Sequence, residues 1–132
     1  MKFPYRKINL KHPFSLKSFI LRPIIPVSLK YGDKSLRYEA LLDSGADFNI
    51  FPLEIAESLG IKFKSNKKLS FSGIGGEPIT GQITEVSLGI GNKTISTKAV
   101  FAEVGNGILG QYGFFDIFSV KFDLKNKEIV IE

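Results

Sequence analysis

The sequence predicts an all-β domain, a small closed barrel with one glycine-rich hairpin and one or two short helices. Strand-like runs recur at roughly ten-residue spacing, and turn residues separate them. The 132 residues are 43% hydrophobic and 12% aromatic, which suits one compact core. There is no cysteine, so burial and hydrogen bonding must stabilise the fold without disulfides or thiolate metal sites.

The expected strands are short, rich in β-branched or aromatic residues and bounded by turn chemistry. They span residues 19–21, 24–30, 36–42, 48–51, 69–71, 79–84, 86–90, 94–101, 108–109, 120–124 and 128–131. Runs of this kind, with short helices between them, favour a small barrel or sandwich, and we expect the closed barrel.

Two segments have helical character. Pro52 is suited to open a helix that runs to Leu59, and Gly60 is placed to act as its left-handed C-terminal cap. Residues 111–118 predict about two further helical turns that bury three phenylalanines.

The first 22 residues differ in charge from the rest of the chain. They contain six of the 18 basic residues and no Asp or Glu, which leaves 12 basic against 13 acidic residues in the remainder, a net charge of −1. We therefore expect a basic, extended N-terminal arm over residues 1–22 and one domain over residues 23–132. A solvated flank is the ordinary meaning of such a charge run.

Asp43 ends an apolar run and is followed by two small residues, Ser44 and Gly45. The tripeptide alone is ordinary turn composition, because Asp and Ser side chains bond nearby backbone amides. A carboxylate that leaves a buried strand is nevertheless costly unless something stabilises it. Two such carboxylates facing each other across a two-fold axis share one proton, which leaves one acid and one base for hydrolysis without metal or histidine.

Three segments, in this order, resemble the retropepsin family of aspartic proteases. They are Leu41-Leu42-Asp43-Ser44-Gly45-Ala46-Asp47, Phe71-Ser72-Gly73-Ile74-Gly75-Gly76 and Gly107-Ile108-Leu109-Gly110. The likeness covers residues 23–131. It implies a six-stranded acid-protease barrel whose second segment is a flap, and an endopeptidase that hydrolyses peptide bonds of a polypeptide substrate without a cofactor or metal.

The resemblance also implies roles for single residues. Asp43 would be the catalytic carboxylate, Ser44 would join the two active-site loops across the dimer axis, and Gly45 completes the catalytic loop. The residues implied in substrate binding are Ala46, Asp47, Ile50, Gly73, Ile74, Gly75, Gly76 and Ile108. Because the chain holds one Asp-Ser-Gly, the second Asp43 must come from another subunit, so a homodimer is expected.

The chain departs from the retroviral pattern in three places. Gln111 stands where those enzymes carry an Arg that orders the acidic residue after the loop, so Asp47 needs another partner, for which Arg22 and Arg37 are the alternatives. The helix after Pro52 is a feature of cellular and bacterial relatives. The long arm and the C-terminal hairpin predict that the dimer interface differs in detail.

Other sequence motifs indicate alternative functional sites only weakly. Residues 105–110 match G-x-G-x-x-G, but the chain that follows is too short for a nucleotide-binding domain. His12 lies in the arm and no serine elbow accompanies it. Asp43, Asp47 and Asp116 lack the spacing of a calcium loop. We read Phe114, Phe115 and Phe118 as core.

Two alternatives to a protease remain open. One is a dimeric binding or scaffold module of the same fold with weak or no catalysis. The other is a nucleic-acid-associated protein that acts through its basic arm, which predicts salt-dependent binding. We rank this last and expect no nucleic-acid or membrane partner. The absence of cysteine and of a secretory apolar segment leads us to expect a cytoplasmic location.

Overall fold

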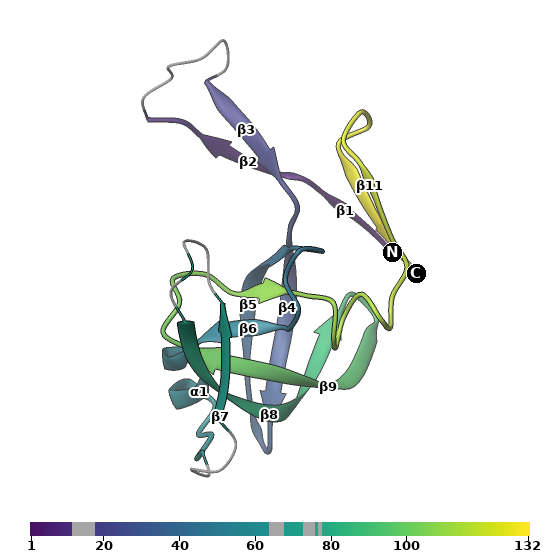
Figure 1. The fold of residues 1–132 in the computed structure, drawn as a ribbon. Helices are drawn as coiled ribbons and strands as arrows, with labels where there is room; N and C mark the ends of the chain where they lie inside the picture. The colour runs from purple at the N-terminus through teal and green to yellow at the C-terminus, as the bar shows by residue number, and fades with distance from the viewer. Residues whose placement is uncertain (12–17, 64–67, 73–75, 77) are drawn as a thin grey trace.

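The computed structural model describes residues 1–11, 18–63, 68–72, 76 and 78–132, and it is mostly β (Figure 1). The strands and the single helix of these residues, in chain order, are β1(Lys2–Pro4), β2(Arg6–Asn9), β3(Phe19–Arg22), β4(Ile24–Tyr31), β5(Lys34–Leu42), β6(Ile50–Pro52), α1(Leu53–Ser58), β7(Lys68–Ser72), β8(Pro78–Ile90), β9(Lys93–Ala102), β10(Ile108–Leu109), β11(Val120–Asp123) and β12(Glu128–Ile131).

Seven strands form the main sheet, in the order β4-β5-β10-β6-β9-β8-β7. β4 also pairs with β8 over residues 28–30, so the pairings lead from β4 through β5, β10, β6, β9 and β8 back to β4. The short strand β10 lies parallel to β5 and antiparallel to β6, which places it between the two segments that flank Asp43.

The core follows from the period-two pattern of the long strands. In β4, Ile25, Val27 and Leu29 are buried while Ser28 and Lys30 are exposed, as expected for a strand with one face on the core. The largest fully buried side chains are Phe51, Phe101 and Phe114. One cluster of buried apolar residues from β4, β5, α1, β8, β9 and the C-terminal strands forms the centre of the molecule.

The helix lies close to where the sequence predicts it. Pro52 is the N-cap of α1 and Leu59 its C-cap, and Gly60 follows with a φ of +69°. Only glycine adopts that angle without strain, so Gly60 ends the helix as expected. Ala56 and Leu59 are fully buried, which anchors the helix to the main core.

Residues 111–118 do not form the predicted helix. Gly113 has a φ of +101°, which interrupts any right-handed helix at its middle. Its carbonyl accepts a hydrogen bond from Thr97 at 2.8 Å, and its N–H donates to Asp116 at 2.9 Å. The segment is therefore a series of turns that still buries Phe114 and Phe118.

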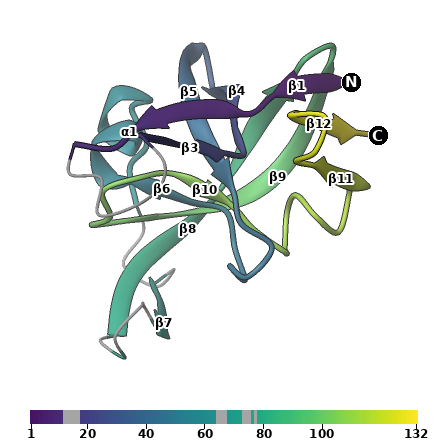
Figure 2. The same ribbon diagram turned by 90° about the horizontal axis from the view of Figure 1, so that it is seen from above.

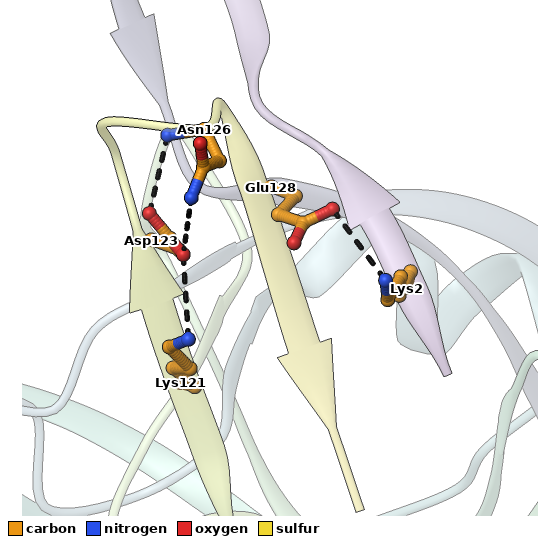
Figure 3. A network of polar contacts seen from close by, with 5 residues as sticks. All are labelled: Lys2, Lys121, Asp123, Asn126 and Glu128. Atoms are coloured by element: carbon orange, nitrogen blue, oxygen red, sulfur yellow. Dashed lines mark hydrogen bonds and ion pairs between the residues drawn. The ribbon is translucent and has the colours of Figure 1, made fainter.

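The two ends of the chain lie side by side in a three-stranded sheet of order β1-β12-β11 (Figure 2). Ile129 and Ile131 of β12 are fully buried. The other face carries charged residues: Lys2 lies 3.9 Å from Glu128, and Lys121 lies 3.3 Å from Asp123 (Figure 3). Burial of alternate β12 residues attaches this sheet to the main core.

Strands β2 and β3 pair with each other as a hairpin that projects from the rest of the molecule (Figure 1). The strand expected near Phe19 is thus present as β3. A difference from the sequence prediction is that residues 78–90 form one continuous strand rather than two, since β8 pairs with β7 at one end and with β9 over most of its length. Within the described ranges no helix is long and apolar enough to cross a membrane.

Candidate active site

Asp43 follows the last residue of β5, where three segments meet. Its backbone N–H donates to the carbonyl of Leu109 at 3.0 Å, and the N–H of Leu42 donates to the carbonyl of Pro23 at 2.9 Å. Leu42 and Leu109 are both buried and are paired in register. The backbone before Asp43 is thus fixed on both sides, and the carboxylate leaves the sheet from a rigid position.

The loop after β5 is a tight turn that orients the Asp43 carboxylate. The N–H of Ala46 donates to the carbonyl of Asp43 at 3.1 Å, and the N–H of Gly45 donates to Oδ1 of the same residue at 2.9 Å. A Cβ at Gly45 would lie 3.2 Å from that oxygen, which is closer than ordinary contact. Asp43 is half-buried, whereas Ser44 and Gly45 are exposed, so the tip of the loop is open to another molecule.

The chain segment after β10, beginning with Gln111, also holds this loop. Its side-chain amide donates to the carbonyl of Ser44, and its backbone N–H donates to the carbonyl of Ala46 at 2.8 Å. The next residue, Tyr112, donates its N–H to the carbonyl of Asp47 at 2.8 Å. The chain that follows β10 therefore fixes three backbone carbonyls of the loop, those of Ser44, Ala46 and Asp47.

Gly110 and Asn49 form the buried base of the site. Gly110 donates its N–H to Oδ1 of Asn49 at 3.0 Å, and Nδ2 of Asn49 donates to the carbonyl of Lys98 at 3.2 Å. Asn49 is fully buried, and these bonds satisfy its amide. A Cβ at Gly110 would lie 2.4 Å from the carbonyl oxygen of Phe48, so no larger residue fits.

A second, partly buried polar contact supports β10. The hydroxyl of Tyr38 accepts a hydrogen bond from the N–H of Gly107 at 2.7 Å. The carbonyl of Gly107 in turn accepts from the N–H of Leu41 at 3.1 Å. A Cβ at Gly107 would lie 2.5 Å from the Tyr38 ring, so with the ring in this position only glycine fits at residue 107.

Sequence reasoning did not assign roles to Asn49 and Tyr38. The signal for Asn49 was available, because an amide between Phe48 and Ile50 in an apolar run must find partners when buried. No comparable signal existed for Tyr38, since its bond joins residues 69 positions apart. Only the folded structure brings its hydroxyl to Gly107.

A small apolar cluster, separate from the main core, lies next to the loop. Ile50 and Ile108 are paired across β6 and β10, and both belong to it. The buried members are Ile50, Val100 and Ala102, with Phe48, Ile79, Ile83, Val104 and Ile108 packed against them. The partly exposed members of this cluster form an apolar surface beside Asp43.

A pocket of about 260 Å³ continues this surface. Phe48 and Tyr112 line it, with ring centroids 5.8 Å apart, and Lys98 and Asp116 contribute charged groups. The remaining lining residues are Ile83, Val100 and Gly113. The pocket is therefore mainly apolar and lies directly beside the end of the Asp43 loop, where Phe48 follows Asp47.

The structure brings most of the predicted site residues together. Asp43, Ser44, Gly45, Ala46 and Asp47 form one loop, with Asp47 exposed. Ile50 and Ile108 lie beside it as a pair.

The glycine-rich segment is described only in part. Gly76 is exposed with a φ of +80°, between the paired strands β7 and β8. Gly73, Ile74 and Gly75 lie outside the described residues, as does His12.

Asp47 has no ion pair with either arginine proposed for it, as far as the described residues extend. Arg6, not Arg22, forms the ion pair at the base of the β2–β3 hairpin, with Glu39 at 2.7 Å. Across the described positions no three His, Asp or Glu side chains are close enough together to hold a metal ion. The chemistry available at the loop is that of an oriented carboxylate beside an apolar surface.

Comparison with known proteins gives a family match and structural matches. The family model described as aspartyl protease matches residues 26–112. Among solved structures, the EIAV protease complexed with the inhibitor HBY-793 is similar to this chain, with a TM-score of 0.58, 22% sequence identity, and coverage of 76% of this chain and 88% of that chain. No curated protein matches the sequence. The family match includes the Asp43 loop and residues 107–110, and the structural likeness concerns the fold.

Proposed function

The chain belongs to the aspartyl protease family and is retropepsin-like, and from this premise we propose that it is an endopeptidase whose catalytic carboxylate is Asp43. The observation that carries the proposal is the geometry of the loop. A half-buried carboxylate accepts a backbone N–H from Gly45, and Gln111 holds the loop from behind. A fixed, partly desolvated carboxylate is what acid–base hydrolysis of a peptide requires.

One chain supplies half of this site. Hydrolysis by paired carboxylates needs one in the acid form and one in the base form, and each chain carries one Asp-Ser-Gly. We propose that two chains form a homodimer with a two-fold axis between their Asp43 side chains. The exposure of Ser44 and Gly45 supports this, because the loop tip is free to meet its counterpart.

In the proposed dimer the two carboxylates share one proton, because two negative charges a few ångströms apart cannot both persist. The ionised Asp43 removes a proton from a water molecule, which attacks the peptide carbonyl. The protonated Asp43 of the other chain donates its proton to the carbonyl oxygen. Collapse of the tetrahedral intermediate then breaks the C–N bond: the first Asp43 gives the proton that it took from water to the leaving amine, and the second Asp43 recovers a proton from a hydroxyl of the intermediate.

The surroundings of the loop fit an extended polypeptide. We propose that the ring of strand pairings is the expected closed barrel and that the β7–β8 hairpin is the flap of the protease. Ala46 and Asp47 would bind substrate main chain, and Ile50 and Ile108 would contact apolar side chains. This surface favours substrates with apolar residues near the cleaved bond.

Asp47 is exposed and has no ion-pair partner within the described part of its own chain. In the dimer we propose that Arg22 of the other subunit supplies one. Arg22 immediately precedes Pro23, whose carbonyl binds the N–H of Leu42, so it lies close to the proposed axis. Arg37 is the less suitable alternative, because it lines a different pocket with Phe3 and Gly89.

The second candidate function is a dimeric binding or scaffold module with weak or no catalysis. It shares the fold and the apolar surface and differs only in what Asp43 does. The two functions differ chemically, because a binding module has no need for a carboxylate that Gly45 orients in a loop bonded by Gln111. Activity measurements on an Asp43 variant separate the two.

The test is cleavage of an unstructured polypeptide by the wild type and by Asp43→Asn, with Asp33→Asn as the matched control. Asp33 lies in the exposed turn between β4 and β5. We expect Asp43→Asn to keep the fold and lose cleavage, and Asp33→Asn to keep both. Cleavage that persists in purified Asp43→Asn would rule out the mechanism.

Subunit exchange tests the dimer. Adding excess Asp43→Asn chains to a fixed amount of wild type should reduce activity below that of the wild type alone, because mixed dimers hold one functional carboxylate. Adding Asp33→Asn chains should increase activity. Undiminished wild-type activity at full exchange would contradict a shared site.

A further inference from the structure

The β2–β3 hairpin is a two-stranded ribbon beside the proposed active site. Its register pairs Arg6 with Arg22 and Ile8 with Ile20. Its strands belong to neither of the larger sheets, and the hairpin projects beyond them (Figure 1). An isolated two-stranded ribbon is marginally stable in water, so such a hairpin gains most of its stability from what it packs against.

The hairpin carries apolar side chains that its own subunit covers only in part. Ile8, Phe19, Ile20 and Leu21 are half-buried, and none of them belongs to either apolar cluster of the described residues. Tyr5, just before β2, is the last residue of the N-terminal segment that packs on the main core. The apolar surface of the hairpin therefore lies beyond the core of its own chain.

The base of the hairpin is fixed at the catalytic end of the molecule. Arg22 ends β3, and the carbonyl of the next residue, Pro23, accepts the N–H of Leu42, which immediately precedes Asp43. At the other strand, Arg6 forms the 2.7 Å ion pair with Glu39 of β5. The hairpin consequently leaves the body within a few residues of the catalytic loop.

The hairpin and the catalytic end of the body carry opposite charge. Arg6 and Arg22 lie directly opposite each other, and like charges in that position repel. Glu39 neutralises Arg6 only. The catalytic end of the body carries the carboxylates Glu39, Asp43 and Asp47, and a two-fold mate brings the same acidic end to the basic hairpin.

We propose that the β2–β3 hairpin is a clasp that packs on the second subunit of the homodimer, with Ile8 and Ile20 at the contact. This rests on the proposed function, because the axis at Asp43 is what places the partner beside Pro23. Each strand has four residues and spans about 13 Å at about 3.3 Å per residue, and the hairpin extends away from the body of its own chain (Figure 1). Apolar contact between the clasp and the partner then stabilises the dimer that catalysis requires.

The test compares full-length wild type with Ile8→Asp/Ile20→Asp and with Tyr31→Asp. Tyr31 is the exposed last residue of β4, at the strand end remote from the hairpin. Dimer dissociation constants come from sedimentation over a dilution series, and activity is measured over the same range. We expect the double variant to dissociate at least tenfold more readily, with activity per dimer restored at high concentration, and Tyr31→Asp to match the wild type.

The possible outcomes separate the clasp from the two-chain mechanism. A folded double variant whose dissociation constant equals that of the wild type overturns the clasp and leaves the protease intact. A wild type that is fully active as a strict monomer overturns both the clasp and the two-chain mechanism. Loss of DNA binding in the double variant, with unchanged dimer stability, would assign the hairpin to nucleic acid and likewise overturn the clasp.

Cross-linking gives an answer even if the double variant does not fold. The chain has no cysteine, so Ser18→Cys, immediately before β3, provides a unique attachment point for a photoreactive group. Mixing isotope-labelled chains with unlabelled chains distinguishes contacts between subunits from contacts within one subunit. We expect cross-linked peptides of mixed isotope content. Cross-links confined to single chains would overturn the clasp.

Discussion

The side-chain amide of Gln111 donates a hydrogen bond to the backbone carbonyl of Ser44. Retroviral proteases carry an arginine at this position, which orders the acidic residue after the loop. Here the amide reaches the loop itself, one residue from Asp43, and leaves Asp47 to other partners. Gln111 is exposed, so its contribution concerns the position of the loop more than the stability of the core.

Gln111→Ala should therefore slow catalysis without unfolding the protein. A neutral hydrogen bond contributes about 1 kcal/mol, so we expect kcat to fall roughly fivefold. KM should change little, because the lost bond positions the carboxylate and not the substrate. Steady-state kinetics on a peptide substrate, with thermal unfolding alongside, measure both effects.

The control is Gln111→Arg, which retains N–H donors for the Ser44 carbonyl and should keep most of kcat. Gln111→Glu matches the native length but lacks the donor, so it should resemble Gln111→Ala. An unchanged kcat in Gln111→Ala would show that the loop does not need this contact.

Gly110→Ala should destabilise the protein and inactivate it, because the added Cβ would lie 2.4 Å from the carbonyl oxygen of Phe48 and 2.7 Å from that of Ala46. Both contacts are with backbone, which cannot rotate away. We expect a loss of more than about 2 kcal/mol in the free energy of unfolding, measured by urea denaturation.

Gly105→Ala is the matched control, because a Cβ there meets nothing within 4 Å. Its unfolding free energy should stay within about 0.5 kcal/mol of the wild type. Equal effects of the two substitutions would contradict the packing of residues 107–110 against the Asp43 loop.

Asn49→Leu should cost about 1–3 kcal/mol of stability, because it leaves the buried N–H of Gly110 and the carbonyl of Lys98 without the Asn49 amide. Since Gly110 packs directly on the loop, activity should fall with stability. Urea denaturation and activity assays below the unfolding transition measure the two effects. Asn92→Leu, in the exposed turn between β8 and β9, is the control and should change neither. A fully stable Asn49→Leu would mean that the amide is dispensable.

Asp123 gives a prediction for pH. Its pKa lies below the ordinary value of 3.8, chiefly because Asn126 donates from its side chain at 2.9 Å and from its backbone at 3.1 Å, with Lys121 adding a charge nearby (Figure 3). The unfolded chain binds this proton at higher pH than the folded chain. The stabilisation is thus complete above the unfolded pKa and is lost as pH falls through the folded one.

Asp123→Asn should accordingly lower Tm at neutral pH, and the difference from wild type should shrink as the pH falls below about 5. Thermal unfolding at a series of pH values, with Asp33→Asn as the control, measures this. A difference that is constant with pH would exclude the carboxylate as its source.

Much of the fold could be predicted from local pattern. Alternating burial in β4, the Pro52 and Gly60 boundaries of α1, and the hairpin after Val120 all follow from residues within a few positions of each other. The prediction of a helix at residues 111–118 was wrong, because Gly113 has a positive φ and lies against Thr97 and Asn49, which are distant in sequence.

The sequence by itself determined the identity of the loop, since Asp43, Ser44 and Gly45 with residues 107–110 are local motifs whose order alone predicts the family. Only the tertiary structure decided what holds that loop. The bonds from Gln111 to Ser44, Gly110 to Asn49 and Gly107 to Tyr38 join residues more than 60 positions apart. Their partners depend on the parallel pairing of β5 with β10, and no local periodicity encodes that pairing.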